Sequence, residues 1–290
     1  MSDGGALINL GELSKPATVL IEKVSDAVGG IAKPWQIKRV ALAEAEADII
    51  RAESKIQISE LEQRALVRMV REEGQKQENI EGITAKAIPH LTPEATPENI
   101  EKDWLTHFFD RCRLVSDQEM QTLWSNVLAG QANNPGTFSK KTVDLIASLD
   151  RADAQLFTKF CSFAWMVNGL SALVLDENND IFARAGINFS SLNHLDDIGL
   201  ITFNNVTGFV RRGFSKYATV FYYGKPVTIE FPQDQNEMQL GKVLLTRAGS
   251  ELASICGSSR SEEYFEYVLS EWLKQNYILS SPITAQSAKV

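Results

Sequence analysis

Residues 35–80 constrain the fold of this chain most strongly. The segment contains no proline and one glycine, Gly74, and it is rich in Ala, Glu, Lys, Arg, Gln and Ile. High helix propensity and closely spaced opposite charges favour one long helix or a helical hairpin. The apolar residues form a broken seam at helical spacing: Ile37, Val40, Ile50, Ile58, Leu61, Ala65 and Met69. This seam predicts a coiled-coil-like stalk, and the alternative is a single solvated helix.

Three prolines mark the end of this helical stretch. Pro89, Pro93 and Pro97 lie close together in the chain. Proline inside a helix removes a backbone hydrogen bond and clashes with the preceding turn, so the helix cannot continue through them. We therefore expect a long helix or hairpin at 35–88 and a linker at 89–97.

Residues 98–167 are expected to form a helical bundle because their apolar residues recur at helical spacing. Four signals divide the segment: a capping box from Ser116 to Glu119, a turn at 133–136, a helix start at Ser139 and an N-cap at Asp150. The last of these helices is expected to carry Phe163 and Trp165.

Residues 168–279 mix helix and strand patterns. A short helix precedes Gly199, strand-like runs separated by glycine follow, and Leu-Thr-x-x-Gly-x-Glu-Leu spans 245–252. This order is typical of a winged-helix-like α+β module, closed by a helix at 261–277 and a flexible tail at 280–290. The expected fold is mainly α with a C-terminal α+β module.

Residues 1–34 are expected to form an N-terminal amphipathic helix. Ser14 can cap the helix, Pro16 suits its first turn, and Gly29 and Gly30 interrupt the pattern before Pro34. Its apolar stripe contains Leu20, Ile21, Val24, Ala27, Val28 and Ile31. Such a stripe either packs on the rest of the protein or serves assembly and membrane contact.

Composition favours a cytoplasmic protein. There is no basic, apolar leader segment and no apolar run long enough to span a bilayer. The formal net charge of −8 means that nucleic-acid binding would need a local basic face. Cys112, Cys161 and Cys256 are far apart and form no CxxC motif, so we expect three reduced, buried thiols.

The sequence offers no clear catalytic or metal site. It contains no phosphate-binding glycine motif, no GxSxG and no closely spaced histidine pair. We therefore expect no enzymatic activity, no metal and no cofactor. The alternative is a hydrolase or nuclease built on His194 with Asp196 and Asp197, where His194 and Asp197 could pair locally; otherwise His194 is an exposed residue at a helix end.

One basic segment lies among aromatic residues. Arg211, Arg212 and Lys216 lie near Tyr217, and positive charge beside aromatic rings suits phosphate contacts and base stacking. These residues are the candidate nucleic-acid or partner surface. The alternative is an ordinary wing whose aromatic side chains pack on the sheet.

Three segments resemble known bacterial proteins. Leu13–Ala27 followed by Lys33-Pro34, the central segments 121–129, 134–136 and 149–154, and Leu-Thr-x-x-Gly-x-Glu-Leu at 245–252 carry the likeness. They resemble the Abi-alpha-like abortive-infection proteins and a related bacterial family of unknown function. The likeness covers most of the chain, and its motifs are structural.

The resemblance implies a role in defence against bacteriophage. We expect a protein that senses a phage protein, self-assembles along residues 35–80 and disrupts the inner membrane through the helix at 17–31. It would be cytoplasmic before activation and move to the inner membrane afterwards. The alternative function is a nucleic-acid-binding regulator that uses the winged-helix-like module.

Overall fold

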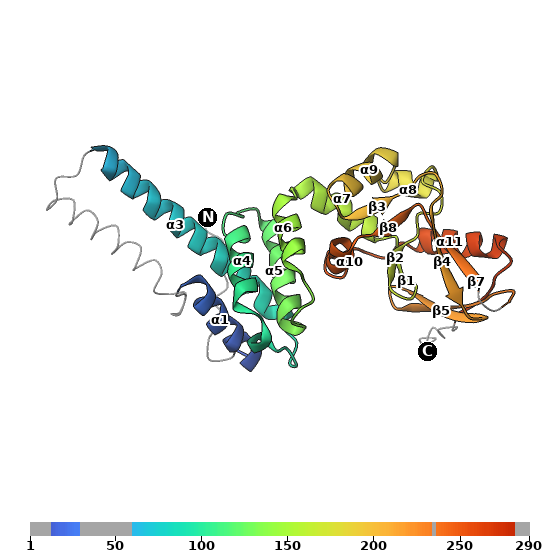
Figure 1. The fold of residues 1–290 in the computed structure, drawn as a ribbon, viewed down its shortest axis with the longest axis horizontal. Coiled ribbons are helices and arrows are strands. Elements are labelled where there is room, and N and C mark those ends of the chain that lie inside the picture. The colour runs from blue at the N-terminus through green and yellow to red at the C-terminus, as the bar shows by residue number, and fades with distance from the viewer. Residues whose placement is uncertain (1–12, 30–59, 234–235, 282–290) are drawn as a thin grey trace, which may run out of the picture. The chain divides into compact units, whose positions relative to one another are not determined.

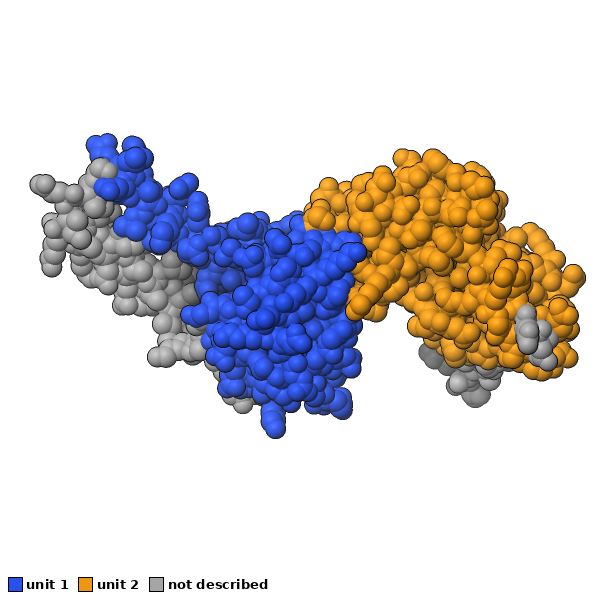
Figure 2. Space-filling model, in the orientation of Figure 1, with its two compact units in different colours: residues 1–147 blue, residues 148–290 orange. Residues whose placement is uncertain are grey.

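A computed structural model of the chain describes residues 13–29, 60–233 and 236–281. The chain divides into two compact units, residues 1–147 and 148–290, called here unit 1 and unit 2 (Figure 2). Unit 1 is helical and unit 2 combines helices with antiparallel sheets, so the fold is mainly α with an α+β C-terminal part. The division after residue 147 differs from the bundle boundary expected at residue 167.

Unit 1 contains five α-helices and two short 3-10 helices among its described residues (Figure 1). They are α1 (Lys15–Val28), α3 (Glu60–Ala87), η2 (Ile88–His90), η3 (Pro97–Asn99), α4 (Lys102–Cys112), α5 (Gln118–Asn133) and α6 (Lys140–Ser148).

Helix α3 has two different halves. Toward its C-terminal end, Ile80, Ile83 and Ala87 are buried and the helix packs on α5. Toward its N-terminal end, Leu61 and Met69 are 68% and 59% exposed. The end of the expected stalk therefore belongs to the core of unit 1. The seam residues before Glu60 lie outside the described part of the chain.

The proline-rich segment is integrated into unit 1. The Thr96 N–H donates to the carbonyl of Ala132 at 3.0 Å. Asn133 accepts a hydrogen bond from the Thr92 N–H at 2.9 Å and donates to the carbonyl of His90 at 3.0 Å. The prolines end α3 as expected, and the linker segment that follows is bonded to the end of α5.

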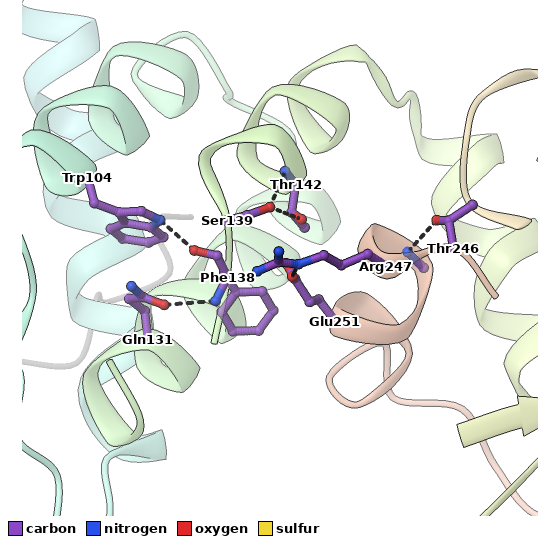
Figure 3. A network of polar contacts seen from close by, with 9 residues as sticks. Trp104, Gln131, Phe138, Ser139, Thr142, Thr246, Arg247 and Glu251 are labelled. Carbon is purple, nitrogen blue, oxygen red and sulfur yellow. Dashed lines mark hydrogen bonds and ion pairs between the residues drawn. The ribbon is translucent and has the colours of Figure 1, made fainter. Parts of the chain in front are cut away.

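Phe138 joins α4, α5 and the start of α6. Its N–H donates to Gln131 Oε1 at 2.9 Å, and its carbonyl accepts from Trp104 Nε1 at 2.8 Å (Figure 3). Its buried ring lies against Gly130, where an added Cβ would come within 2.7 Å of the ring. Both backbone groups of a buried loop residue are thus satisfied by buried side chains, which fixes the loop between the helices.

The caps of the central helices agree with the sequence in two cases and differ in one. Ser139 Oγ accepts from the Thr142 N–H at the start of α6, and Asp150 is the N-cap of the next helix. At α5, however, Asp117 is the N-cap, and its side chain accepts hydrogen bonds from the N–H groups of Glu119 and Met120. The capping box expected from Ser116 is therefore wrong by one residue, because the adjacent carboxylate takes the cap position.

Unit 2 contains the following helices and strands: α7 (Arg151–Cys161), β1 (Ala164–Met166), β2 (Leu170–Ala172), α8 (Asp180–Arg184), α9 (Phe189–Asp197), β3 (Ile201–Phe203), β4 (Phe209–Phe214), β5 (Tyr217–Tyr222), β6 (Lys225–Glu230), β7 (Asn236–Gly241), β8 (Val243–Leu245), α10 (Arg247–Ala253), α11 (Glu262–Lys274) and β9 (Ile278–Ser280). The strand order of the largest sheet is β2-β1-β5-β6-β9, and β3 pairs with β8 and β4 with β7, all antiparallel.

Trp165 lies at the centre of the unit 2 core. Its fully buried indole is stacked with Tyr222 and Phe265 and meets Trp272 edge-on. The expectation that Trp165 continues the helix α7 is wrong. The helix ends at Cys161, and Trp165 lies in the β1–β2 hairpin.

The Leu-Thr-x-x-Gly-x-Glu-Leu motif joins α10 to the turn between α9 and β3. Thr246 is the N-cap of α10, and its Oγ1 donates to the carbonyls of Gly199 and Leu200 at 2.8 and 3.1 Å. Gly249 lies against the same turn, where a Cβ would be 1.9 Å from the Leu200 oxygen. The motif's threonine and glycine are therefore packing residues, and the helix–strand–wing–strand–helix order expected around it is observed.

Candidate functional site

Both ends of α1 lie at residues that were expected from the sequence to start and end the helix. Ser14 is the N-cap, and its Oγ accepts from the Ala17 N–H at 3.4 Å, with Pro16 in the first turn. Gly29 ends the helix in the left-handed conformation, at a φ of +86°. Glycine adopts this conformation without the penalty that a Cβ brings. The expected helix is observed from Lys15 to Val28, and it ends before Ile31, the last residue of the expected stripe.

The apolar stripe of α1 is packed on unit 1. Ala17 and Leu20 are 0% exposed and Val24 is 2% exposed, and the helix contacts α4 and η3 (Figure 1). Three further residues of the proposed membrane and assembly face are half-buried: Ile21, Ala27 and Val28. Ile31 lies outside the described residues. The described residues of the predicted face are therefore buried or half-buried in the docked helix.

Two of the polar contacts of α1 are long hydrogen bonds to the rest of unit 1. Lys23 Nζ donates to the carbonyl of Ile100 at 3.4 Å, and Thr106 Oγ1 donates to the carbonyl of Ala27 at 3.4 Å. Each such hydrogen bond contributes about 0.5–1.5 kcal/mol, whereas burying one aliphatic side chain contributes about 1.5–3 kcal/mol. Docking of α1 is thus mainly apolar, through Leu20 and Val24.

The basic segment is less positive than its sequence suggests. The Arg211 guanidinium donates to two backbone carbonyls of the β1–β2 turn, those of Val167 and Asn168, the latter at 3.1 Å. Arg212 Nε lies 3.2 Å from Glu237 Oε2 on the paired strand β7. Arg211 therefore supports the hairpin, and Arg212 faces a carboxylate.

Lys216 and Tyr217 share one acidic partner. Lys216 Nζ and the Tyr217 hydroxyl each lie 3.4 Å from Glu230 Oε1. Two of the three basic groups at this surface therefore face carboxylates. A phosphate backbone would meet little net positive charge here, so the arrangement does not favour the nucleic-acid alternative.

His194 pairs with a residue that sequence reasoning missed. His194 Nε2 lies 2.6 Å from Asp153 Oδ1, so the structure pairs it with α7 and not with Asp197. Asp153 Oδ2 also accepts the Asp150 N–H at 3.0 Å. Burial raises the pKa of the Asp153 carboxyl, but the bonds from His194 and Asp150 outweigh burial and lower the pKa below its usual value. The ionised carboxylate links α7 to α9, and no local sequence signal marks this pair.

Within residues 13–29, 60–233 and 236–281, no group of three or more His, Cys, Asp and Glu side chains is placed to hold a metal ion. In that same described part of the chain, no helix is long and apolar enough to cross a bilayer.

Comparison with known families assigns most of the chain. Residues 63–269 match the family described as Protein of unknown function (DUF2806). The chain belongs to this family. Comparisons with curated proteins and with solved structures found no match.

The DUF2806 match extends from the first turn of α3 into α11. It includes η3 and α4, the elements on which α1 docks, whereas α1 itself precedes the matched residues. The family description gives no activity.

Proposed function

We propose that this protein is a cytoplasmic, non-enzymatic bacterial effector of antiphage defence. In this proposal a phage protein triggers self-assembly, and the assembled chains disrupt the inner membrane through α1. The observation that carries the proposal is the apolar docking of an amphipathic helix on α4 and η3. The defence role itself rests on the resemblance of the motif segments to the Abi-alpha-like proteins.

The docked helix provides a two-state element. The face that would enter a lipid interface contains Leu20 and Val24, which are buried against unit 1. One face cannot contact both surfaces at once, so docking and membrane binding exclude each other. Any event that weakens docking shifts the population toward the membrane-competent state.

The exposed half of α3 is proposed as the assembly surface, and its occupant is a second copy of this chain. Leu61, Val67 and Met69 are 68%, 37% and 59% exposed. Arg68 and Glu72 add both charge signs to the same half of the helix, which suits pairing with an identical helix. Gathering several copies raises the local concentration of α1 at the bilayer without any new contact.

Changing Thr106 tests the docked state from the side of α4. Its hydroxyl donates to the last turn of α1, whose carbonyls carry partial negative charge. We expect Thr106→Asp to repel this end of α1. A repulsion of about 0.3–1 kcal/mol would raise the undocked population roughly two- to fivefold. We expect Thr106→Lys to attract the same end and lower that population. Hydrogen exchange of the α1 amides measures the effect, and growth of uninfected cells measures toxicity.

Thr122→Asp is the matched control, because it makes the same charge change on the exposed surface of α5. It should leave α1 exchange and growth unchanged. If Thr106→Asp and Thr106→Lys shift α1 exchange in the same direction, or if neither changes it, the proposed docking switch is wrong.

A further inference from the structure

Two cysteines that are distant in sequence lie together in unit 2. Cys161 is the last residue of α7, and Cys256 lies in the loop between α10 and α11. Thr158 Oγ1 donates to the carbonyl of Cys256 at 3.2 Å, which ties the loop to α7. The side chains of Cys161 and Cys256 lie close enough for each to shift the pKa of the other, in addition to the effect of burial. Both thiols are free, and the expectation of three buried thiols is wrong for Cys256, which is only half-buried.

Polar groups surround the side chain of Cys256. Its thiol donates to the carbonyl of Ala253 at 3.5 Å, and its interactions with Cys161 and Ser258 favour the thiolate by lowering its pKa. The Tyr223 hydroxyl lies 2.5 Å from Ser258 Oγ and 3.4 Å from the carbonyl of Cys161. When Tyr223 donates to Ser258, the serine proton is free to point at the sulfur. The loop therefore surrounds one sulfur atom with groups that stabilise a thiolate.

The two thiols differ in acidity. The hydrogen bond from Cys161 lowers the pKa of Cys256, burial opposes this, Ser258 adds to the lowering, and the pKa becomes about 7. Burial raises the pKa of Cys161 well above its usual value. At neutral pH roughly half of Cys256 is then thiolate, while Cys161 stays protonated. A half-buried, acidic thiol beside a buried, protonated thiol is the arrangement of an attacking and a resolving cysteine.

We propose that Cys256 is a modification site for hydroperoxides and that Cys161 resolves the oxidised sulfur into an intramolecular disulfide. The Cys256 thiolate attacks one peroxide oxygen, so that an S–O bond forms, the O–O bond breaks and hydroxide leaves as water after taking a proton. The Cys161 sulfur then attacks the sulfenic acid. The S–S bond forms, the S–O bond breaks, and the departing hydroxide takes the Cys161 proton to give a second water. The dithiol loses two electrons and the peroxide gains them.

The product would fasten the α10–α11 loop covalently to the end of α7. The loop also contains Ser258, whose partner Tyr223 directly follows β5. Oxidation would therefore restrain one face of unit 2, and a dithiol reductant would release it. This inference stands on unit 2 alone and is independent of the proposed role of α1.

The test uses the full-length reduced protein and hydrogen peroxide. We expect the intact mass of the monomer to fall by about 2 Da, the mass of the two hydrogen atoms lost with disulfide formation. Peptide mapping should identify the linked pair as Cys161 and Cys256. In Cys161→Ala, dimedone should trap a sulfenic acid on Cys256. In Ser258→Ala, the thiolate fraction of Cys256 at pH 7, measured by the pH dependence of alkylation, should fall roughly fivefold.

Cys112→Ala is the matched control, because Cys112 is a buried thiol of unit 1. This variant should keep the loss of mass, and Cys256→Ser should abolish it. Three results would overturn the proposal: both cysteines remaining free in peroxide, a disulfide-linked dimer through Cys256, or equal oxidation of wild type and Cys256→Ser. The wild-type peptide map decides the matter even if Cys161→Ala fails to fold.

Discussion

Gly249→Ala is expected to unfold unit 2 under conditions in which the wild type is stable. The added Cβ would lie 1.9 Å from the Leu200 oxygen and 3.0 Å from its carbonyl carbon. This carbonyl cannot easily move, because it accepts hydrogen bonds from both the N–H and the hydroxyl of Thr246. We expect a loss of more than about 3 kcal/mol and a fall in Tm of roughly 10 °C. Denaturant and thermal unfolding of the full chain measure both quantities.

Gly257→Ala is the control for this prediction. Gly257, unlike Gly249, has a positive φ, +74°, and an added Cβ there would meet no atom within 4 Å. Its replacement should cost only about 1 kcal/mol, from the backbone conformation alone. If Gly249→Ala and Gly257→Ala destabilise the protein equally, close packing of α10 on the Leu200 turn is not what the motif glycine provides.

Leu20→Asp is expected to abolish membrane permeabilisation in infected cells. Leu20 is 0% exposed at the centre of the docked stripe of α1. A carboxylate there cannot stay in the apolar contact, and it is equally unsuited to a lipid interface. The variant should therefore lose protection of the α1 amides from exchange and also lose permeabilisation, whereas Thr106→Asp loses protection but gains toxicity. Dye uptake after infection and hydrogen exchange of the purified protein separate the two effects.

Thr18→Asp adds the same charge to the exposed side of the same helix. It should preserve docking and permeabilisation, since an acidic residue in the first turn suits the helix dipole. Undiminished dye uptake in the Leu20→Asp variant would show that the apolar face of α1 is not the membrane-active element.

Local structure followed from the sequence where one or two neighbouring residues determine it. Ser14, Ser139 and Asp150 cap the helices that they were expected to cap, and Gly29 ends α1. One further local signal lies in the turn between β1 and β2. Asn168-Gly169, with φ values of +46° and +117°, turns β1 into β2, and an Asn-Gly pair favours a tight hairpin.

Partnerships between distant segments were beyond sequence reasoning. Helical spacing shows that Leu20 and Val24 share a face, but it does not show which surface covers that face. The sequence offers Asp197 as a local partner for His194, whereas the fold brings Asp153 to it. Likewise, Cys161 and Cys256 meet only because α7 and the loop after α10 pack together. A single sequence does not show which distant segments of the chain come into contact.

Accessibility of α1 in living cells tests the central claim most directly. Val24 is 2% exposed in the docked helix, whereas Thr18 is exposed. Val24→Cys and Thr18→Cys, each in a Cys256→Ser background, would be labelled with a membrane-permeable maleimide before and after infection by lytic phage. The account predicts that Cys at position 24 is protected before infection and labelled as fast as Cys at position 18 afterwards. Protection that persists while infected cells die, or equal labelling of both positions before infection, would contradict it.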